Sequence, residues 1–188
     1  MTPYEAACAA IDRANAADPA GHELPYSRRM VEWTRTLAPG ASEELRLAAR
    51  AQHVRRWETP RSAYPEGRAG YLRWREGLKK FHADVLAALM REAGYAEASV
   101  AKAAGLLLRK NLAADPEGQT LEDAACLVFL QFEFADFTTK TEEGKVVDIL
   151  RKTWGKMSPA AREAALKLSF APREADLVNR ALRGPSVG

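Results

Sequence analysis

Apolar and polar residues recur along this chain with the three-to-four-residue period of amphipathic helices, and the alternation typical of strands is nearly absent. Alanine is abundant, whereas the β-branched residues valine, isoleucine and threonine are sparse. The pattern therefore predicts an all-α protein of about seven to nine helices. The length of 188 residues fits one domain that spans residues 1–188.

Start and stop signals give the bounds of these helices. Thr2, Pro3 and Glu5 form a helix start, with a threonine cap, proline in the first turn and glutamate at the third position. Pro and Gly residues between 59 and 70, and again between 111 and 119, indicate connecting loops. The expected helices cover residues 2–15, 25–38, 42–54, 71–93, 97–110, 120–137, 141–157, 158–168 and 172–182.

Composition excludes some classes of protein. No apolar run approaches the roughly 18 residues of a membrane span, and the N-terminus lacks the basic and apolar regions of a signal peptide. The two cysteines, Cys8 and Cys126, lie in helical apolar segments and are expected to be buried and reduced. We therefore expect a cytoplasmic protein without a membrane partner.

The three histidines, His22, His53 and His82, fall one to each of three consecutive expected elements. Ligands from separate helices can converge on a metal ion in the core of a bundle. A lone histidine on an apolar helix face is also often a hydrogen-bonded core residue. His82 is expected to point inward, because Leu78 and Leu86 flank it at helical spacing.

A carboxylate on the apolar helix over 120–137 is the natural fourth ligand, and Asp123 is the candidate. The alternative is that Thr120 and Asp123 form an arrangement close to a capping box, because acidic residues suit the first turn of a helix. Glu23 and Asp84, each close to a histidine in sequence, are weaker substitutes for Asp123.

Positive charge is concentrated between residues 53 and 80. Eight cations and three anions give this segment a net charge of +5, against +3 for the whole chain. Arginine can bind phosphate with two parallel hydrogen bonds, and aromatic rings can stack on bases, so a nucleotide-like or other anionic ligand fits this composition. The alternative is a solvated basic helix whose aromatic residues dock on the core. The cations are Arg55, Arg56, Arg61, Arg68, Arg73, Arg75, Lys79 and Lys80, and the interleaved aromatics are Trp57, Tyr64, Tyr71 and Trp74.

The order of these elements resembles the HD-domain superfamily, a helical fold of metal-dependent phosphohydrolases. The resemblance covers about residues 20–135, as an HD-like core that the C-terminal helices over 138–183 follow. The phrases HELPYSRRM, QHVRRWE, YPEGRAGYLRWR and LEDAACLVFL also resemble a bacterial and fungal family of unknown function. The stretches that carry the HD likeness are His22-Glu23-Leu24, Leu45 to His53, Phe81-His82-Ala83-Asp84, Glu92 to Tyr95, and Leu121-Glu122-Asp123-Ala124.

The resemblance implies His22, His53 and Asp123 as metal ligands, with His82 where some members have an additional histidine. Val54 stands where the superfamily has the aspartate of its His-Asp pair, so His82 is expected to replace that ligand. Three histidines and one aspartate suit a single divalent transition metal ion, namely Mn, Fe, Zn or Co. The di-iron oxygenases of the superfamily use four histidines, which this chain does not have.

These observations lead to the hypothesis of a metal-dependent phosphohydrolase-type enzyme that acts on a nucleotide or another small phosphorylated, anionic substrate. In such an enzyme, Glu23 or Glu58 would orient the water molecule that attacks the substrate. Because Val54 removes a ligand, the alternative is a non-catalytic anion or nucleotide sensor on a degenerate HD-like fold. RNA binding is a further possibility that the modest net charge disfavours. The expected substrate-binding residues are Arg29, Arg56, Arg61 and Lys110, and Tyr26, Ser27, Arg28 and Arg109 could face the same site.

Overall fold

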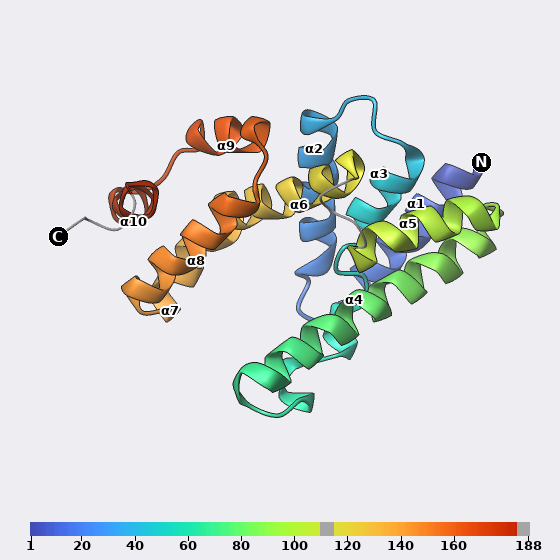
Figure 1. Ribbon diagram of the computed structural model, residues 1–188. Coiled ribbons are helices and arrows are strands. Elements are labelled where there is room, and N and C mark those ends of the chain that lie inside the picture. Colours follow the sequence, from blue (N-terminus) through green and yellow to red (C-terminus); the bar gives the residue numbers. More distant parts are fainter. Residues whose placement is uncertain (110–114, 184–188) are drawn as a thin grey trace. The chain divides into compact units, whose positions relative to one another are not determined.

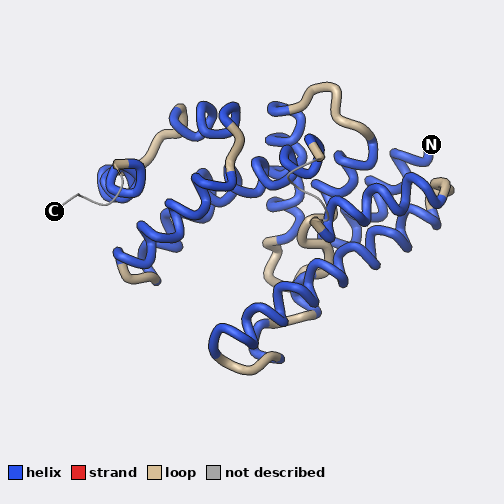
Figure 2. The backbone as a smooth tube through the Cα atoms, in the orientation of Figure 1, coloured by secondary structure: helices blue, strands red, loops and turns tan. Residues whose placement is uncertain are grey.

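Every regular element is helical in the residues that the computed structural model describes, which are 1–109 and 115–183 (Figures 1 and 2). The predicted all-α class is confirmed for these residues. Contacts between residues divide the chain into two compact units, Met1–Leu121 and Glu122–Gly188. Each unit is described by itself below, and the single domain over residues 1–188 stays a prediction.

The first unit is built around the pair α4 and α5, with α3 packed on α5, α2 and α1. Helix caps start its helices as the sequence predicts: Thr2 and Glu5 form the capping box of α1, and Ser42 Oγ accepts the N–H of Leu45 in α3. Its elements are α1 (Pro3–Ala16), α2 (Glu23–Leu37), α3 (Glu43–Arg50), η1 (Arg56–Glu58), η2 (Arg61–Ala63), α4 (Gly67–Glu92), α5 (Glu97–Leu108) and the first turns of α6 (Pro116–Val128).

The core of this unit consists of apolar side chains that the helical period places on inward faces. Ile11, Met30, Leu45, Leu86 and Met90 have no exposed surface. They come from α1, α2, α3 and α4, so one core joins four helices.

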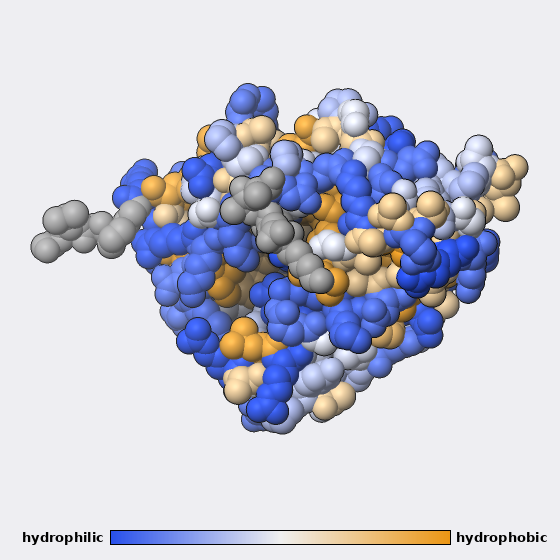
Figure 3. All heavy atoms as spheres, turned by 45° about the vertical axis from the view of Figure 1, so that its right-hand side comes forward, coloured by the Kyte–Doolittle hydropathy of each residue, from blue (hydrophilic) through white to orange (hydrophobic). Residues whose placement is uncertain are grey.

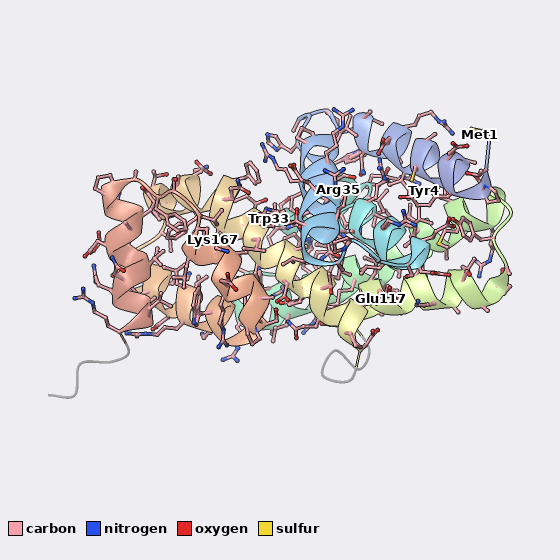
Figure 4. All side chains as sticks on the ribbon, turned by 90° about the horizontal axis from the view of Figure 1, so that it is seen from above. Met1, Tyr4, Trp33, Arg35, Glu117 and Lys167 are labelled. Atoms are coloured by element: carbon pink, nitrogen blue, oxygen red, sulfur yellow. The ribbon has the colours of Figure 1, made fainter. Side chains whose placement is uncertain are left out.

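Polar contacts add to this core at its edges. The Glu117 carboxylate accepts the backbone N–H and the hydroxyl of Ser42, both at 3.0 Å, and lies 2.8 Å from Lys102 Nζ. These contacts attach the start of α6 to α3 and α5, and Figure 4 labels Glu117 at this place. Near α1, the Arg46 guanidinium lies 4.8 Å from the centroid of the Tyr4 ring.

The second unit consists of the end of α6, the π-helical turn η4 (Phe129–Glu133), α7 (Phe134–Lys140), α8 (Glu143–Lys156), α9 (Pro159–Leu166) and α10 (Pro172–Leu182). Helix α10 packs on α8 and α7. The core contains Leu127, Phe134, Val146 and Leu177, each with no more than 1% of its surface exposed.

The largest differences from the predicted helix bounds concern three helices. Helix α3 ends at Arg50 instead of Val54, α4 begins at Gly67 inside the predicted loop, and α6 begins at Pro116 instead of residue 120. The sequence prediction places the proline at the start of α6 in a connector, although proline is favoured in a first helical turn. The expected helix over 120–137 is divided by η4, so the described residues form ten α-helices where about seven to nine were expected.

The face drawn in Figure 3 is mostly hydrophilic, and hydrophobic residues appear on it as separate patches. None of the helices in the described residues has the length and apolar content that crossing a membrane requires. Both cysteines are free thiols, as predicted, but only Cys126 is buried, while Cys8 is partly exposed.

Candidate functional site

His53 lies in a turn that follows α3, and the end of α3 is fixed by two side chains. The carbonyl oxygen of Arg50 accepts Asn15 Nδ2 from α1 at 3.2 Å and Ser27 Oγ from α2 at 2.7 Å. Beyond His53, Arg55 has a positive φ of 55°, and the chain changes direction there before η1 begins. This local geometry turns His53 toward α2 instead of continuing the helix.

Three side chains surround the imidazole of His53. The Tyr26 ring is stacked on it, with the centroids 3.9 Å apart and the planes 8° from parallel. Glu23 Oε2 lies 3.5 Å from His53 Nδ1, and Arg56 Nη1 lies 3.1 Å from His53 Nε2. Because a guanidinium only donates, Nε2 is the acceptor and the proton of the neutral ring is on Nδ1, facing the carboxylate.

His82 lies beside His53, with the ring centroids 6.1 Å apart. It is 4% exposed, so the prediction that it points inward is confirmed. Its Nδ1 donates to the backbone carbonyl of Val54 at 2.9 Å, which leaves the lone pair on Nε2. That Nε2 atom is buried and has no hydrogen-bond partner among the described residues.

Both imidazoles are neutral in this environment. Burial lowers the pKa of His82 to about 3, with His53 and Arg56 adding to the effect and the bond to Val54 opposing it. Burial, together with the guanidiniums of Arg56 and Arg109, also holds the pKa of His53 well below its usual range. Neutral imidazole is the form that binds a metal ion or accepts a proton.

Glu23 occupies the first turn of α2, where Asp18 fixes the backbone. The Asp18 carboxylate accepts the backbone N–H groups of Ala20, His22 and Glu23 at 2.7 to 3.1 Å. Although burial alone would raise it, these bonds hold the pKa of Asp18 below its ordinary value. Asp18 is not among the predicted site residues, although an Asp-Pro pair before a helix is a signal for this kind of turn.

Glu23 itself is buried, with 9% of its surface exposed. Burial raises the pKa of Glu23 to about 7, with Asp18 adding to the rise, and Arg56 and His22 opposing it. The carboxyl group next to His53 therefore titrates near neutral pH, the range in which a group can both take and give a proton.

Arg56 connects His53 to an aromatic side chain of α4. Its guanidinium carbon lies 5.0 Å from the centroid of the Trp74 ring. Trp74 Nε1 donates to the carbonyl of Thr59 at 2.9 Å, which holds the ring against the loop that follows η1. Arg56 is thereby held in place next to His53 from a second side.

Comparison with known proteins identifies a family for this chain. A family model described as "Domain of unknown function (DUF4202)" matches residues 5–178. The chain belongs to the DUF4202 family. No curated protein and no solved structure matches it. The DUF4202 match extends over both units, and it includes Glu23, His53 and His82.

The DUF4202 chain brings together only some of the predicted site residues. Glu23, His53, His82 and Arg56 form one cluster. His22 is exposed, and no contact of its ring with the other two histidines is found among the described residues. Within residues 1–109 and 115–183, no group of three or more His, Cys, Asp or Glu is arranged to hold a metal ion.

The other predicted residues of the first unit have different surroundings. Glu58 forms an exposed pair with Arg55, at 2.6 and 2.9 Å. Arg61 donates to the carbonyls of Tyr64 and Gly67 and so fixes the loop before α4. Arg29 is partly buried in α2. Lys110 lies outside the described residues.

Asp123 belongs to the second unit, where its Oδ1 accepts the backbone N–H of Ser158 at 2.9 Å, next to the start of α9. The proposed capping box with Thr120 is wrong, because α6 begins at Pro116 and the Thr120 hydroxyl donates to the Pro116 carbonyl. Asp123 is nearly fully buried. Its role as a metal ligand stays a prediction.

Proposed function

We propose that the chain is a metal-dependent phosphohydrolase-type enzyme that uses His53 and His82 as metal ligands and acts on a nucleotide or another small phosphorylated compound. We keep the HD-like interpretation of the sequence. Of the three predicted histidine ligands, we retain His53 and His82 and leave out His22. The observation that carries it is the buried Nε2 atom of His82, which has a lone pair and no partner among the described residues.

The hydrogen bonds around the two imidazoles support this assignment. Metal-binding histidines commonly donate their other N–H to a backbone carbonyl or a carboxylate, which fixes the tautomer. His82 donates Nδ1–H to the Val54 carbonyl, and the Nδ1–H of His53 faces Glu23. In both rings Nε2 therefore carries the lone pair, and the ring centroids are 6.1 Å apart. His82 Nε2 has no partner among the described residues, whereas His53 Nε2 accepts Arg56 Nη1 at 3.1 Å, so a bound ion would displace the Arg56 contact.

A divalent ion bound to these nitrogens supplies Lewis acidity toward a phosphoryl oxygen and a bound water of lowered pKa. Side chains of the cluster supply proton transfer, charge neutralisation and positioning. Glu23 orients His53 and lies where it can accept a proton from water. Arg56 neutralises the charge that develops on the phosphoryl group, and Trp74 and Tyr26 keep Arg56 and His53 in position.

Metal content tests this proposal directly. Protein purified without a histidine tag should bind Mn, Fe, Zn or Co stoichiometrically in elemental analysis. His53→Ala and His82→Ala should both lose the ion, whereas His22→Ala should keep it, because His22 is exposed and outside the cluster. A wild-type protein that binds no metal under any of these conditions would overturn the proposal.

A second candidate function is anion binding without catalysis, and the contact of Arg56 favours it. Arg56 already supplies a positive group to His53 Nε2, so the cluster has a cationic group for an anion without a metal ion. Phosphate and nucleotides should then bind to chelator-treated protein. Arg56→Ala should abolish this binding, and Arg55→Ala should not, since Arg55 is paired with Glu58 on the surface. Titration calorimetry on these two neighbouring variants separates this candidate from the enzyme.

A further inference from the structure

The first turns of α4 form an exposed surface that the proposed site does not use. Of the residues from Gly67 to Arg73, only Gly70 is buried. Tyr71 is 42% and Leu72 50% exposed, an unusual exposure for two adjacent large hydrophobic residues in this chain. We call the face of this region that carries Arg68, Tyr71, Leu72 and Arg75 the α4 surface.

The α4 surface is held in a fixed conformation although little covers it. Helix α4 has 26 residues and α5 only 12, so α5 accompanies only part of α4; Figure 1 shows the first turns of α4 extending past it. The loop of residues 59–66 packs on these turns through Gly70 and Gly77. A Cβ atom at Gly70 would lie 1.8 Å from the carbonyl oxygen of Pro65, so the loop contacts the helix backbone directly.

Charge on this part of the helix is strongly positive. Five cations and one anion lie between Gly67 and Lys80, a net charge of +4 within a chain whose total is +3. Lys79 pairs with Glu76, and Lys80 pairs with Asp84. Arg68 and Arg73 are exposed and form no ion pair with a described residue. These two guanidiniums are therefore available to an anionic partner.

An aromatic track runs from this surface toward the candidate site. The Arg75 guanidinium lies 5.8 Å from the centroid of the Tyr71 ring, and the Tyr71 and Trp74 rings are 5.9 Å apart with 46° between their planes. Trp74 in turn contacts Arg56. Exposed aromatic faces that alternate with arginines are the arrangement on which the bases and phosphates of a single strand bind.

We propose that the α4 surface binds single-stranded RNA, with a base stacked on Tyr71 and the phosphates contacted by Arg68 and Arg75, which lie three and four positions from Tyr71 on the same face of the helix. The small net charge of the whole chain disfavours wrapping of nucleic acid, but it does not oppose a local site with +4. Two apolar side chains are too few to insert a helix into a lipid surface. Arginine also donates to the ribose 2′-hydroxyl, which favours RNA over DNA. The proposal does not depend on a metal or on catalysis.

Fluorescence anisotropy with a labelled oligouridylate of about twelve nucleotides tests it, at low salt of about 50 mM, where phosphate contacts are strongest. Tyr71→Ala should weaken binding roughly fivefold or more, and Tyr71→Phe, which keeps the ring face, should stay close to wild type. Arg68→Ala should weaken binding and lower the slope of log K against log salt by about 0.7. Arg35→Ala, an exposed arginine on α2, is the matched control and should change neither value.

Several results would overturn the proposal. One is an absence of binding to the oligouridylate at low salt. Others are equal affinity for Tyr71→Ala and wild type, and tighter binding of oligodeoxythymidylate or duplex RNA than of oligouridylate. If the protein co-sediments with phosphatidylserine vesicles and does not bind the oligonucleotide, the surface binds membranes instead of RNA. Circular dichroism of each variant checks that the helix is intact.

Discussion

His82 Nδ1 donates to the backbone carbonyl of Val54 over 2.9 Å, while the Val54 side chain is fully buried. Val54 thus orients a histidine through its main chain and fills the core with its side chain. The backbone contact needs no particular side chain at position 54, whereas the buried position requires an apolar one.

Replacing Val54 by aspartate is therefore expected to destabilise the protein. A carboxylate at this fully buried position should reduce the free energy of unfolding by about 3 kcal/mol or more at neutral pH. Val54→Ala is the control for lost packing and should cost about 2 kcal/mol. Urea denaturation at neutral pH measures both variants, and an equal stability of the two would mean that water reaches this position.

The raised pKa of Glu23 predicts that the stability of the metal-free protein depends on pH. The pKa of Glu23 is about 7 in the folded state and 4.5 as a free side chain. Between pH 4.5 and pH 7, Glu23 is therefore protonated in the folded protein and ionised in the unfolded chain. Stability from this group is therefore lost as the pH rises from about 4.5 to 7, on the order of 3 kcal/mol in total. Glu23→Gln should remove this loss, and its melting temperature relative to wild type should rise between about pH 4 and pH 8. A constant difference across this range would contradict the prediction.

Two glycines in helices should respond in opposite ways to alanine. Gly70→Ala places a Cβ atom against the Pro65 carbonyl, which cannot move without displacing the loop, and should destabilise the protein by about 1–3 kcal/mol. Gly105 in α5 has no atom of the described residues within 4 Å of a Cβ atom, so Gly105→Ala should stabilise the protein by up to about 1 kcal/mol through helix propensity. Thermal unfolding compares the two, and stabilisation by Gly70→Ala would show that the loop is not packed on α4.

Asp123 has a structural contact that can be separated from metal binding. Asp123→Ala removes the acceptor of the Ser158 N–H and should lower stability by about 1–3 kcal/mol. Asp123→Asn keeps an oxygen acceptor and should lose less. If Asp123 ligates a metal ion, elemental analysis should show reduced metal content in Asp123→Asn, because a neutral amide is a poorer ligand. Full metal content in a stable Asp123→Asn variant would leave only the structural role.

The sequence alone determined the helical class, most helix starts and the inward orientation of His82. These features depend on residues close together in the chain: a threonine or serine before a first turn, or leucines three and four positions from a histidine. The sequence also singled out His53, Arg56 and Trp74, because an unusual density of basic and aromatic residues is visible without any fold.

Only the tertiary structure decided which of these residues meet. The sequence could not show that Tyr26 stacks on His53 or that Asp18 accepts the backbone N–H of Glu23. It also could not show that Arg61 donates to a carbonyl of the loop before α4 while Arg56 contacts His53. The sequence also could not show that α3 ends before His53 and that His22 stays exposed. The physical reason is that pairing, burial and pKa depend on distances between elements far apart in the chain, whereas helix periodicity and capping act within a few residues.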